Sequence, residues 1–220
     1  MAKVIIFGVE DFASLAHFYL KNDSQHTIEA FSINEKFISG AKKFEGLPII
    51  PFEDIEKSYS PNDYYFFAPM SYRKMNQLRS QIYLAVKDKG YKMINYISSS
   101  AIISPKTQIG DNCFILEKVI VQPFVSIGNN VMIWSGSQIS HHSVVKDHVF
   151  FGAHVAVSGH CKVDSYSFLG INSTLKERTH LKEGVLLAMS AAITGDTECW
   201  SVYKGIPARK SPGSSKDFDI

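Results

Sequence analysis

The chain has 220 residues and a formal net charge of +2, and 45% of its residues are hydrophobic. This length allows one large domain or two small ones with a buried core, and the balanced charge argues against a nucleic-acid-binding protein. No apolar run approaches the ~20 residues of a membrane helix. Three cysteines without CxxC spacing argue against a disulfide framework or a structural zinc site, so we expect a protein of the reducing cytoplasm.

Residues 1–97 alternate strand-like and helix-like stretches. "KVIIFG", "TIEAFSI", "YYFFAPM" and "KMINYI" are typical of strands, whereas "GLPIIPFEDI" carries two prolines and looks irregular. "DFASLAHFYLKND" is typical of a helix with Asp11 as its N-cap, and a second helix is expected from Ser71 to Gly90. The alternation predicts a Rossmann-like βαβ domain, in which helices cover a small parallel sheet.

After three serines at 98–100, the pattern changes to a period of six. Sixteen large apolar residues follow one another at this interval from Ile103 to Ile193, and the residue two positions before each is small or β-branched. A helix has a period of 3.6 and a simple strand a period of two. The period of six predicts a hexapeptide repeat and a parallel β-helix, with three repeats in each triangular coil.

The β-helix is expected to cover residues 98–210, followed by a flexible tail at 211–220. The large apolar residues would fill the interior, and the small residues would lie where the chain turns. Cys113 and Cys161 fall in the small-residue positions. We therefore expect both to be packing residues rather than reactive thiols.

Four histidines share the period of six: His142, His148, His154 and His160 each precede an interior residue by three. They should occupy equivalent points on successive faces, and His142 should stack under His160, which comes three repeats later. His141 lies one residue outside this series. Spacing alone leaves open whether one of these histidines is catalytic or whether all are polar turn residues facing solvent or a subunit interface.

The segments "GDNCFI", "SGSQISHHSVV", "SGHCKV", "YSFLGINSTL" and "GIPARK", behind a βαβ domain, resemble the left-handed β-helix sugar acyltransferases. This family includes sialic-acid O-acetyltransferase and the bacillosamine-type N-acetyltransferases, and the resemblance spans residues 3–210. It implies a cytoplasmic homotrimer that transfers acetyl from acetyl-CoA directly to a nucleotide-linked sugar. Such enzymes serve bacterial surface-polysaccharide biosynthesis, including O-antigen and lipopolysaccharide. An amine or a hydroxyl acceptor, a UDP or a dTDP sugar, and a longer acyl donor all remain open.

The resemblance also implies a catalytic base. The family's base matches His141 in "ISH", and an imidazole, with an ordinary pKa near ~6.5, suits proton abstraction at neutral pH. Relatives often carry an orienting carboxylate immediately after the base, whereas this chain has His142. We therefore expect His142 or a neighbour to tune His141. Asp147 is the nearest acidic residue in the sequence, with no spacing to show that it reaches the base.

The same resemblance assigns residues to the two substrates. The Gly159 N–H would face the thioester oxygen as an oxyanion donor. Coenzyme A would be bordered by Ile171, Ala188, Met189, Arg209 and Lys210, the last two from "GIPARK". The nucleotide sugar would meet Gly8, Glu10, Asp11, Asn34 and Arg73.

The sequence leaves other roles open for the expected nucleotide-sugar residues. "GVEDFA" lacks the second and third glycines of a GxGxxG loop, so NAD binding is poorly supported. Acidic Glu10 and Asp11 would repel a pyrophosphate at that helix start. Asp11 could be only a helix cap, Asn34 only a turn residue, and Arg73 only part of a solvated helix start.

Two other classes of protein compete with a sugar acyltransferase. A γ-type carbonic anhydrase shares the prism and binds zinc through three histidines, but the N-terminal βαβ domain and "GIPARK" argue against it. A non-catalytic scaffold is the other alternative, which coenzyme A binding would exclude. We expect acetyl-CoA as co-substrate and no metal.

Overall fold

The computed structural model describes residues 1–218, which form two compact units. The first comprises Met1–Ser71 and Gln81–Tyr96, and the second comprises Tyr72–Ser80 and the chain from Ile97 on. The sequence predicted one uninterrupted N-terminal domain over 1–97. The short segment 72–80 instead packs within the second unit.

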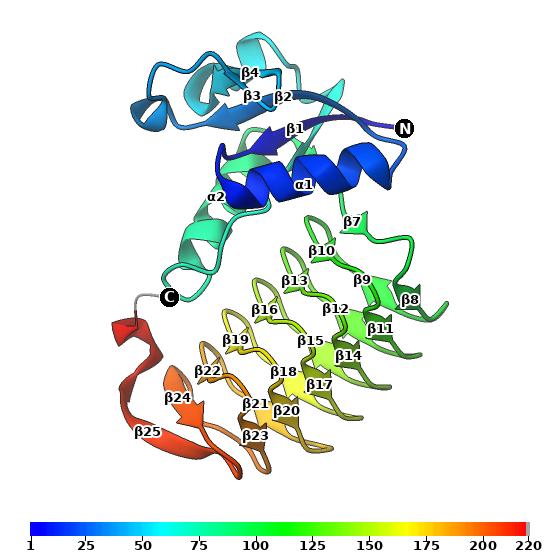
Figure 1. Cartoon of the computed structure of the whole chain (residues 1–220), viewed down its shortest axis with the longest axis vertical. Helices are drawn as coiled ribbons and strands as arrows, with labels where there is room; N and C mark the ends of the chain where they lie inside the picture. The colour runs from blue at the N-terminus through cyan, green and yellow to red at the C-terminus, as the bar shows by residue number, and fades with distance from the viewer. Residues whose placement is uncertain (219–220) are drawn as a thin grey trace. The chain divides into compact units, whose positions relative to one another are not determined.

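A six-stranded sheet is the centre of the first unit (Figure 1). Its strand order is β3, β4, β2, β1, β5, β6, and all neighbours are parallel except the β3–β4 hairpin. The strands are β1 (Lys3–Phe7), β2 (Thr27–Ile33), β3 (Lys43–Phe44), β4 (Leu47–Pro51), β5 (Tyr64–Phe67) and β6 (Lys92–Met93). The helices are α1 (Asp11–Asn22), η1 (Glu35–Phe37), η2 (Phe52–Lys57) and α2 (Gln77–Asp88). The central β1, with later strands on both sides, confirms the Rossmann-like sheet.

The start of α1 differs in detail from the prediction. The N-cap is Glu10 rather than Asp11, and no side chain caps the helix. Glu10 has an extended backbone, with φ −124° and ψ −171°, and its carbonyl accepts the N–H groups of Ala13 and Ser14 at 2.9 and 3.0 Å. Asp11 is already helical, so its carboxylate contributes only a negative charge in the first turn, where the helix dipole favours it.

The stretch "GLPIIPFEDI" is not irregular, as the sequence predicted, but forms β4 and η2. β4 pairs in parallel with β2, and Pro51 stands at its last position, opposite Ile33. On its other side, β4 meets only the two-residue β3, where Pro48 pairs with Lys43. Because β4 is almost an edge strand, few of its N–H groups are needed for the ladder, and prolines are tolerated there.

The stretch "KMINYI" divides into two strands, β6 in the sheet of the first unit and β7 (Tyr96–Ile97) at the passage to the second unit. Beyond it, two-residue strands pair in parallel with strands three repeats away, for example Phe114 with Met132 and Ile120 with Gln138. Sixteen such strands, β8 to β23, follow without an interrupting loop and form three sheets (Figure 1). This confirms the parallel β-helix and its coil of three hexapeptides.

The strands are arranged face by face. The first face contains β10 (Phe114–Ile115), β13 (Met132–Ile133), β16 (Phe150–Phe151), β19 (Phe168–Leu169) and β22 (Leu186–Leu187), extended by β24 (Ser201–Lys204) and β25 (Arg209–Ser214). The second contains β8 (Ile102–Ile103), β11 (Ile120–Val121), β14 (Gln138–Ile139), β17 (Ala156–Val157), β20 (Thr174–Leu175) and β23 (Ala192–Ile193). The third contains β9 (Gln108–Ile109), β12 (Ser126–Ile127), β15 (Val144–Val145), β18 (Lys162–Val163) and β21 (His180–Leu181).

The large apolar residue of each repeat points into the prism. The fourteen from Ile115 to Ile193 are no more than 3% exposed, whereas Ile103 and Ile109 in the first coil are partly buried. The predicted register of six is therefore correct from the first coil to the last. At about 25 cal/mol per Å² of apolar surface, this continuous core is the main source of stability of the prism.

The turns explain why histidines recur every sixth residue. The residue three before each interior residue, from position 112 to position 190, has a positive φ between 54° and 74°. Glycine and asparagine adopt this left-handed conformation readily, and histidine is enriched in it among the other residue types. His142, His148, His154 and His160 all occupy this position, so their spacing is a property of the turn.

The small-residue positions form a second repeating contact. The side chains of Ser137, Ser143 and Ser167 each donate to a backbone carbonyl 15 residues later, at 2.9 to 3.0 Å. The thiols of Cys113 and Cys161 make the same contact, to Gly128 and Lys176. Burial raises the pKa of the Cys113 thiol to about 12. The two cysteines are therefore buried, protonated packing residues, as predicted.

The helix expected from Ser71 begins only at Gln77. Lys74, Met75 and Asn76 have φ values of 52°, 52° and 64°, which an α-helix cannot accommodate. Met75 is fully buried in a cluster with Leu186 and Val202 on the first face of the prism. The hydrophobic contact therefore overrides the local preference for helix.

Arg79 fixes the same segment from inside. Its guanidinium is fully buried and donates to both the backbone carbonyl and the side-chain oxygen of Asn130. It also donates to the side-chain oxygen of Asn76 at 2.8 Å and to the backbone carbonyl of His148 at 3.3 Å. Burial lowers the pKa of Arg79 to about 9. Asn76 in turn donates to the carbonyls of residues 166 and 167. These contacts hold residues 72–80 on the corner between β15 and β16.

The flexible tail expected from residue 211 is instead ordered as far as the structure describes it. β25 pairs with β24, and η3 (Ser215–Asp217) follows, with Ser214 and Asp217 forming a capping box. Ser215 is fully buried and donates to the carbonyl of Gly184 at 2.5 Å. Residues 219 and 220 lie outside the described residues.

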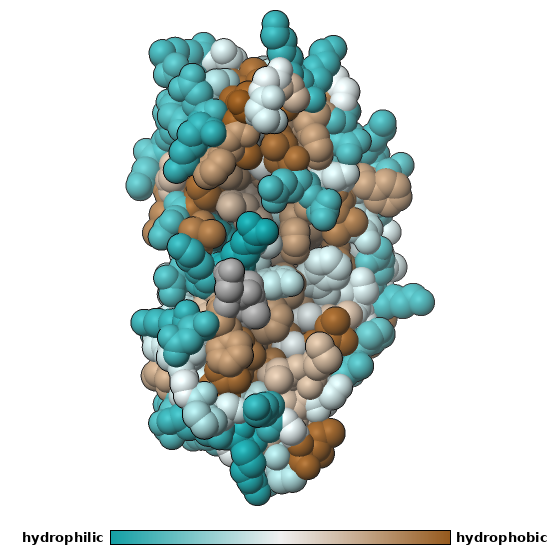
Figure 2. Space-filling model, turned by 60° about the vertical axis from the view of Figure 1, so that its left-hand side comes forward, coloured by the Kyte–Doolittle hydropathy of each residue, from teal (hydrophilic) through white to brown (hydrophobic). Residues whose placement is uncertain are grey.

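Hydrophobic side chains also reach the surface of the second unit. Ile102, Phe124, Ile171, Met189 and Ile206 are between 50% and 77% exposed. On the face shown in Figure 2, apolar side chains lie between hydrophilic ones. Across residues 1–218, no helix has both the length and the apolar character needed to cross a bilayer.

Candidate active site

Three exposed histidines meet at the corner between the second and third faces. His141 and His142 form the turn after β14, and His160 occupies the corresponding turn of the next coil. The Nδ1 atoms of His141 and His142 are 3.2 Å apart. The rings of His142 and His160 stack with centroids 4.9 Å apart, and the ring of His141 stands at 84° to that of His160. The prediction that His142 lies under His160 is confirmed.

The surroundings of His160 disfavour a positive charge on its ring. The pKa of His160 lies below the ordinary histidine value, first because hydration is lost beside its neighbours and then because the Arg178 guanidinium and the imidazoles of His142 and His141 oppose a further positive charge. One ligand atom from each of the three histidines lies within 4.8 Å of the others, so the same residues could hold a metal ion.

Gly159 determines where the ring of His141 can lie. It comes three repeats after His141 and therefore lies directly above it, in the next coil. A Cβ at Gly159 would come within 2.7 Å of Cε1 and 3.0 Å of Nε2 of His141. Only glycine leaves room for this ring position. From below, the backbone N–H of His141 donates to the Gln122 side chain at 3.0 Å.

The Gly159 backbone has the group that an oxyanion requires. Its carbonyl accepts the N–H of Arg178 at 3.0 Å. Its own N–H has no acceptor within residues 1–218. The ring of His141 therefore lies against a residue whose N–H has no acceptor among the described residues, and these are the two residues that the resemblance assigned to the base and the oxyanion donor.

Asp147 does not lie with His141. Its carboxylate accepts the backbone N–H of Asn129 at 2.7 Å and the Asn129 side chain at 3.3 Å, at the corner between β15 and β16. It therefore supports a turn at another corner. His142 is the residue that contacts the ring of His141.

His148 shares the turn position of His142 but is only 7% exposed. Burial, and then the charge of Arg79, lower its pKa to about 4, so the ring is neutral at pH 7. Its Nδ1 contacts the Asn130 amide at 2.9 Å. His148 is a structural residue of the corner that holds Arg79.

One histidine–carboxylate pair was not predicted. His180 Nε2 and Asp164 Oδ2 are 2.6 Å apart on the third face, and Lys162 lies 3.1 Å from the other carboxylate oxygen. Partial burial would raise the pKa of Asp164, but the hydrogen bonds from His180 and Lys162 outweigh it and lower the pKa. The signal in the sequence was weak, because the two residues are not separated by a whole number of repeats.

The expected coenzyme residues lie at a different corner of the coil. Ile171, Ala188 and Met189 follow β19 and β22, between the first and second faces, and Ile171 and Met189 are 50% and 74% exposed. A Cβ at Gly170 would lie 2.6 Å from the Met189 backbone nitrogen, so glycine lets these turns stack closely. Within one chain, the second face separates this apolar corner from His141.

Arg209 and Lys210 begin β25, and both are exposed. Lys210 lies 2.5 Å from Glu198, and the hydrogen bond to this carboxylate raises the lysine pKa. Among the described residues, the Arg209 side chain contacts only the carbonyl of Ala208, at 3.5 Å. These two positive side chains are accessible to a negatively charged ligand.

Four of the expected nucleotide-sugar residues follow adjacent strands of the first unit. Gly8, Glu10 and Asp11 come after β1, and Asn34 comes after β2. Gly8 has φ +108° and donates to the carbonyl of Ser32 at 2.8 Å, which ties the loop after β1 to the end of β2. Ligands of open parallel sheets bind at this carboxyl edge.

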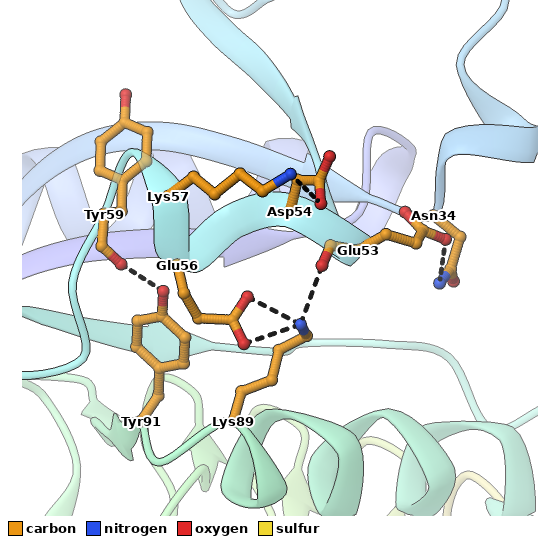
Figure 3. Close-up of polar contacts among 8 residues, drawn as sticks. All are labelled: Asn34, Glu53, Asp54, Glu56, Lys57, Tyr59, Lys89 and Tyr91. Carbon is orange, nitrogen blue, oxygen red and sulfur yellow. Dashed lines mark hydrogen bonds and ion pairs between the residues drawn. The ribbon is translucent and has the colours of Figure 1, made fainter.

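The side chain of Asn34 is held by Glu53, as Figure 3 shows. Glu53 accepts the Asn34 amide at 3.2 Å and the Glu35 N–H at 2.9 Å. Partial loss of hydration would raise the pKa of Glu53, but these hydrogen bonds outweigh it, so the pKa lies below its ordinary value. Lys89 bridges the carbonyl of Glu53 and the carboxylate of Glu56. Asn34 therefore presents its carboxamide from a fixed position.

The fifth expected substrate residue, Arg73, does not lie at a helix start, since α2 begins at Gln77. It is exposed on the segment 72–80 and belongs to the second unit. The structure therefore groups Gly8, Glu10, Asp11 and Asn34 within one unit and Arg73 within the other.

Comparison with known proteins supports the repeat assignment. The family described as bacterial transferase hexapeptide (six repeats) matches residues 106–141 and 124–159. This covers the turns that contain His141 and His142 and ends at Gly159.

Solved structures with the same fold include acetyltransferases. A variant of perosamine N-acetyltransferase from Caulobacter crescentus, in complex with CoA and GDP-perosamine, has a TM-score of 0.86 at 18% identity, covering 97% of this chain and 98% of that one. The acetyltransferase domain of PglB from Neisseria gonorrhoeae has a TM-score of 0.81 at 19% identity, over 96% and 100% of the chains. WeeI from Acinetobacter baumannii has 0.80 at 17%, over 96% and 100%.

These comparisons define the class of fold. The chain has the fold of a left-handed β-helix, hexapeptide-repeat sugar acyltransferase, with a Rossmann-like N-terminal unit. The fold predicted from the sequence is confirmed in both parts.

Proposed function

We propose that this protein is an acetyl-CoA-dependent N-acetyltransferase acting on a nucleotide-linked amino sugar. The observation that carries the proposal is the position of His141, whose ring fills the space beside the Cα of Gly159 in a turn of the β-helix, while the Gly159 N–H has no acceptor within residues 1–218. The similarity in fold to an N-acetyltransferase holding CoA and GDP-perosamine supports the choice of both substrates.

His141 is the proposed general base. Its Nδ1 faces His142, so a proton on Nδ1 can be donated to the His142 Nδ1, which leaves the His141 Nε2 lone pair for the acceptor amine. As the amine nitrogen attacks the thioester carbon, its proton passes to Nε2. His142 is then a positioning residue that selects the tautomer of the base, in place of the carboxylate often found in relatives.

The Gly159 N–H is the proposed oxyanion donor. Attack converts the thioester carbonyl into a tetrahedral oxyanion, and a fixed backbone N–H stabilises this charge. Collapse of the intermediate breaks the C–S bond, and the protonated His141 returns its proton to the coenzyme A thiolate. No acyl-enzyme forms, so no nucleophilic side chain is required.

The coenzyme would lie against Ile171, Ala188 and Met189, with Arg209 and Lys210 near its phosphates. The exposed apolar side chains of Ile171 and Met189 suit the pantetheine arm. These residues and His141 occupy different corners of one coil. A homotrimer, in which the corner of one subunit faces that of the next, would supply both sets to one site, and we propose this assembly.

The nucleotide would lie at the carboxyl edge of the first unit's sheet. The N–H of Gly8 donates there to Ser32, two residues before Asn34, and a carboxamide such as that of Asn34 can pair with a nucleobase edge. Acidic Glu10 and Asp11 are better suited to ribose hydroxyls than to phosphates. Arg73 is the proposed phosphate ligand.

On the resemblance in sequence, we also place the enzyme in bacterial surface-polysaccharide synthesis, in the O-antigen or lipopolysaccharide type of pathway, in the cytoplasm. Free thiols at Cys113, Cys161 and Cys199 are compatible with this compartment.

A mass-spectrometric screen tests the proposed function. Acetyl-CoA is incubated with a panel of UDP-, dTDP- and GDP-linked amino sugars, and with their hydroxyl analogues. We expect an added acetyl group on one amino sugar, with release of coenzyme A. Acetylation of a hydroxyl analogue alone would identify an O-acetyltransferase, and no coenzyme A binding at all would refute the proposal.

A further inference from the structure

The three histidines at the corner of β14 and β15 have a geometry that proton abstraction alone does not require. A single imidazole and one partner suffice for a base. Here a third ring, His160, stacks on His142 at 4.9 Å and stands 5.3 Å from His141, all three being exposed. Within residues 1–218, no carboxylate hydrogen bonds to any of the three rings.

The spacing of their nitrogens fits a transition-metal ion. In a tetrahedral zinc site with Zn–N bonds of about 2.1 Å, ligand nitrogens are about 3.4 Å apart. The Nδ1 atoms of His141 and His142 are already 3.2 Å apart, and all three ligand atoms lie within 4.8 Å of one another. Small side-chain rotations of exposed rings would close the remaining distance.

The backbone holds the three ligands together. His141 and His142 are consecutive, and the N–H of His160 donates to the carbonyl of His141 at 3.0 Å. His142 and His160 both have the left-handed turn conformation, with φ 58° and 57°. Three imidazoles on two stacked turns of one chain thus form a preorganised site with the fourth coordination position open to solvent.

We infer that His141, His142 and His160 bind one divalent transition-metal ion per chain, of the zinc class, and that this ion inhibits the enzyme. Imidazole is a preferred ligand of zinc, copper and nickel, whereas magnesium and calcium require oxygen ligands. The inhibition rests on the proposed function, because a metal ion on Nδ1 of His141 leaves the ring's N–H proton on Nε2, so that Nε2 has no lone pair to accept the proton of the amine. The metal-binding site itself does not depend on that function.

Zinc binding to the protein without an affinity tag tests the site. Zn²⁺ is titrated into the wild-type chain and into H160N, in competition with a chromophoric chelator. Asparagine tolerates the left-handed turn but does not replace an imidazole. The matched control is H154N, since His154 is exposed and has the same turn conformation at another corner, with φ 57°.

We expect one zinc ion per wild-type chain, unchanged affinity in H154N, and affinity at least about 10-fold lower in H160N, because removing even an outer-shell partner costs about 10–100-fold. Equal affinity in wild type and H160N, or no stoichiometric binding in the wild type, would overturn the site. Mg²⁺ at the same concentration should not compete.

The inhibition is measured as the ratio of acetyl-transfer rates with and without saturating Zn²⁺. We expect this ratio to fall at least about 10-fold in the wild type and in H154N, and to stay near one in H160N at the same zinc concentration. A zinc-loaded wild-type enzyme with an unchanged rate would refute the inhibition. If no acceptor sugar is found, the proposed function fails, while the binding titration still decides the metal site.

Discussion

At the scale of single residues, His141 differs from the other histidines of the β-helix turns by one position in the repeat. The left-handed turn position favours histidine for its backbone conformation, and His142, His148, His154 and His160 all occupy it. His141 precedes that position, so the turn itself does not require a histidine there. Its ring instead lies against Gly159, three repeats later, where only a glycine leaves room for it.

Replacing His141 should therefore separate catalysis from coenzyme binding. H141A and H141N should lower kcat by about 10²–10⁴, the usual contribution of a general base. Coenzyme A affinity should be retained, because the base contacts the acceptor. H142A should have a smaller effect on kcat. Steady-state kinetics and calorimetric titration of coenzyme A check this, and near-native turnover of H141A together with loss of activity in H142A would contradict the assignment.

Gly159 gives a second residue-level prediction. In G159A, the three atoms nearest to the new Cβ all belong to the exposed ring of His141, which can move aside, so the free energy of unfolding should change by less than about 1 kcal/mol. The displaced ring should nevertheless lower kcat substantially.

Gly128 is the matched control for this substitution. A Cβ there would lie 2.8 Å from the Asp147 backbone nitrogen, which cannot move aside. G128A should therefore lose about 1–3 kcal/mol of stability, as overpacked positions do. Chemical denaturation and kcat measured on both variants check the pair. A G159A enzyme with normal turnover would show that the ring of His141 does not need its observed position.

At the scale of elements, the two-residue strands have no stability of their own and depend on stacking. Each strand contributes one interior side chain, and its backbone pairs with the strands three repeats before and after it. The turns add side-chain contacts to carbonyls 15 residues later. Stability should therefore be sensitive to interior positions and insensitive to exposed turn positions.

Ile133 is the test of this register. It is fully buried midway along the prism, whereas Lys146 is exposed on a turn. I133A should lower the free energy of unfolding by roughly 2–5 kcal/mol, through lost burial and the cavity left behind, while K146A should be near neutral. Equal effects in denaturant titrations would be incompatible with the six-residue register.

The corner that holds Arg79 should make stability depend on pH. The pKa of His148 falls from 6.5 to about 4 on folding because the ring is buried. Between these values the unfolded chain binds the proton and the folded chain does not, so stability falls as the pH is lowered. The loss from pH 7 to pH 5 should be about 2 kcal/mol.

In H148N, this part of the pH dependence should disappear. H154N, at an exposed turn with the same conformation, should keep the wild-type loss. Free energies of unfolding at pH 7 and pH 5 for the three proteins check the prediction. A full-sized loss in H148N would mean that other groups carry the acid sensitivity.

At the scale of the whole molecule, the proposed site is incomplete in one chain. His141 lies at one corner of the coil and the apolar side chains of Ile171 and Met189 at another, with the second face between them. Exposed Ile102 and Phe124 add apolar surface to the prism that a partner subunit would cover.

We therefore predict a homotrimer of 24.6 kDa chains. Sedimentation equilibrium at micromolar concentration should give about three times the chain mass, and M189D, which places a charge on the apolar corner, should weaken coenzyme A binding without unfolding the prism. A monomeric wild-type protein would remove the basis for both the assembly and a site shared between subunits.

The sequence alone determined the interior of the prism, because its cause is local and repeats. Every sixth residue from Ile103 to Ile193 is large and apolar. A period of six matches neither an α-helix nor a simple strand, and it is typical of a parallel β-helix. The strands of the first unit were also readable, apart from the two-residue β3 and from β4, whose prolines are tolerated by its position in the sheet. The proposed histidine base and its glycine could be named only through the resemblance to a family.

Tertiary structure decided what covers each turn. His148 and His154 have the same place in the repeat, yet His148 is buried and neutral while His154 is exposed. The difference comes from Arg79, whose guanidinium reaches the carbonyl of His148 from 69 residues earlier in the chain. The same packing delays the start of α2 to Gln77, because burying Met75 and satisfying Asn76 outweigh the preference of that segment for helix. Such long-range contacts have no signature in the local pattern, so the fold follows from the repeat, whereas the environment of each histidine follows from what packs against it.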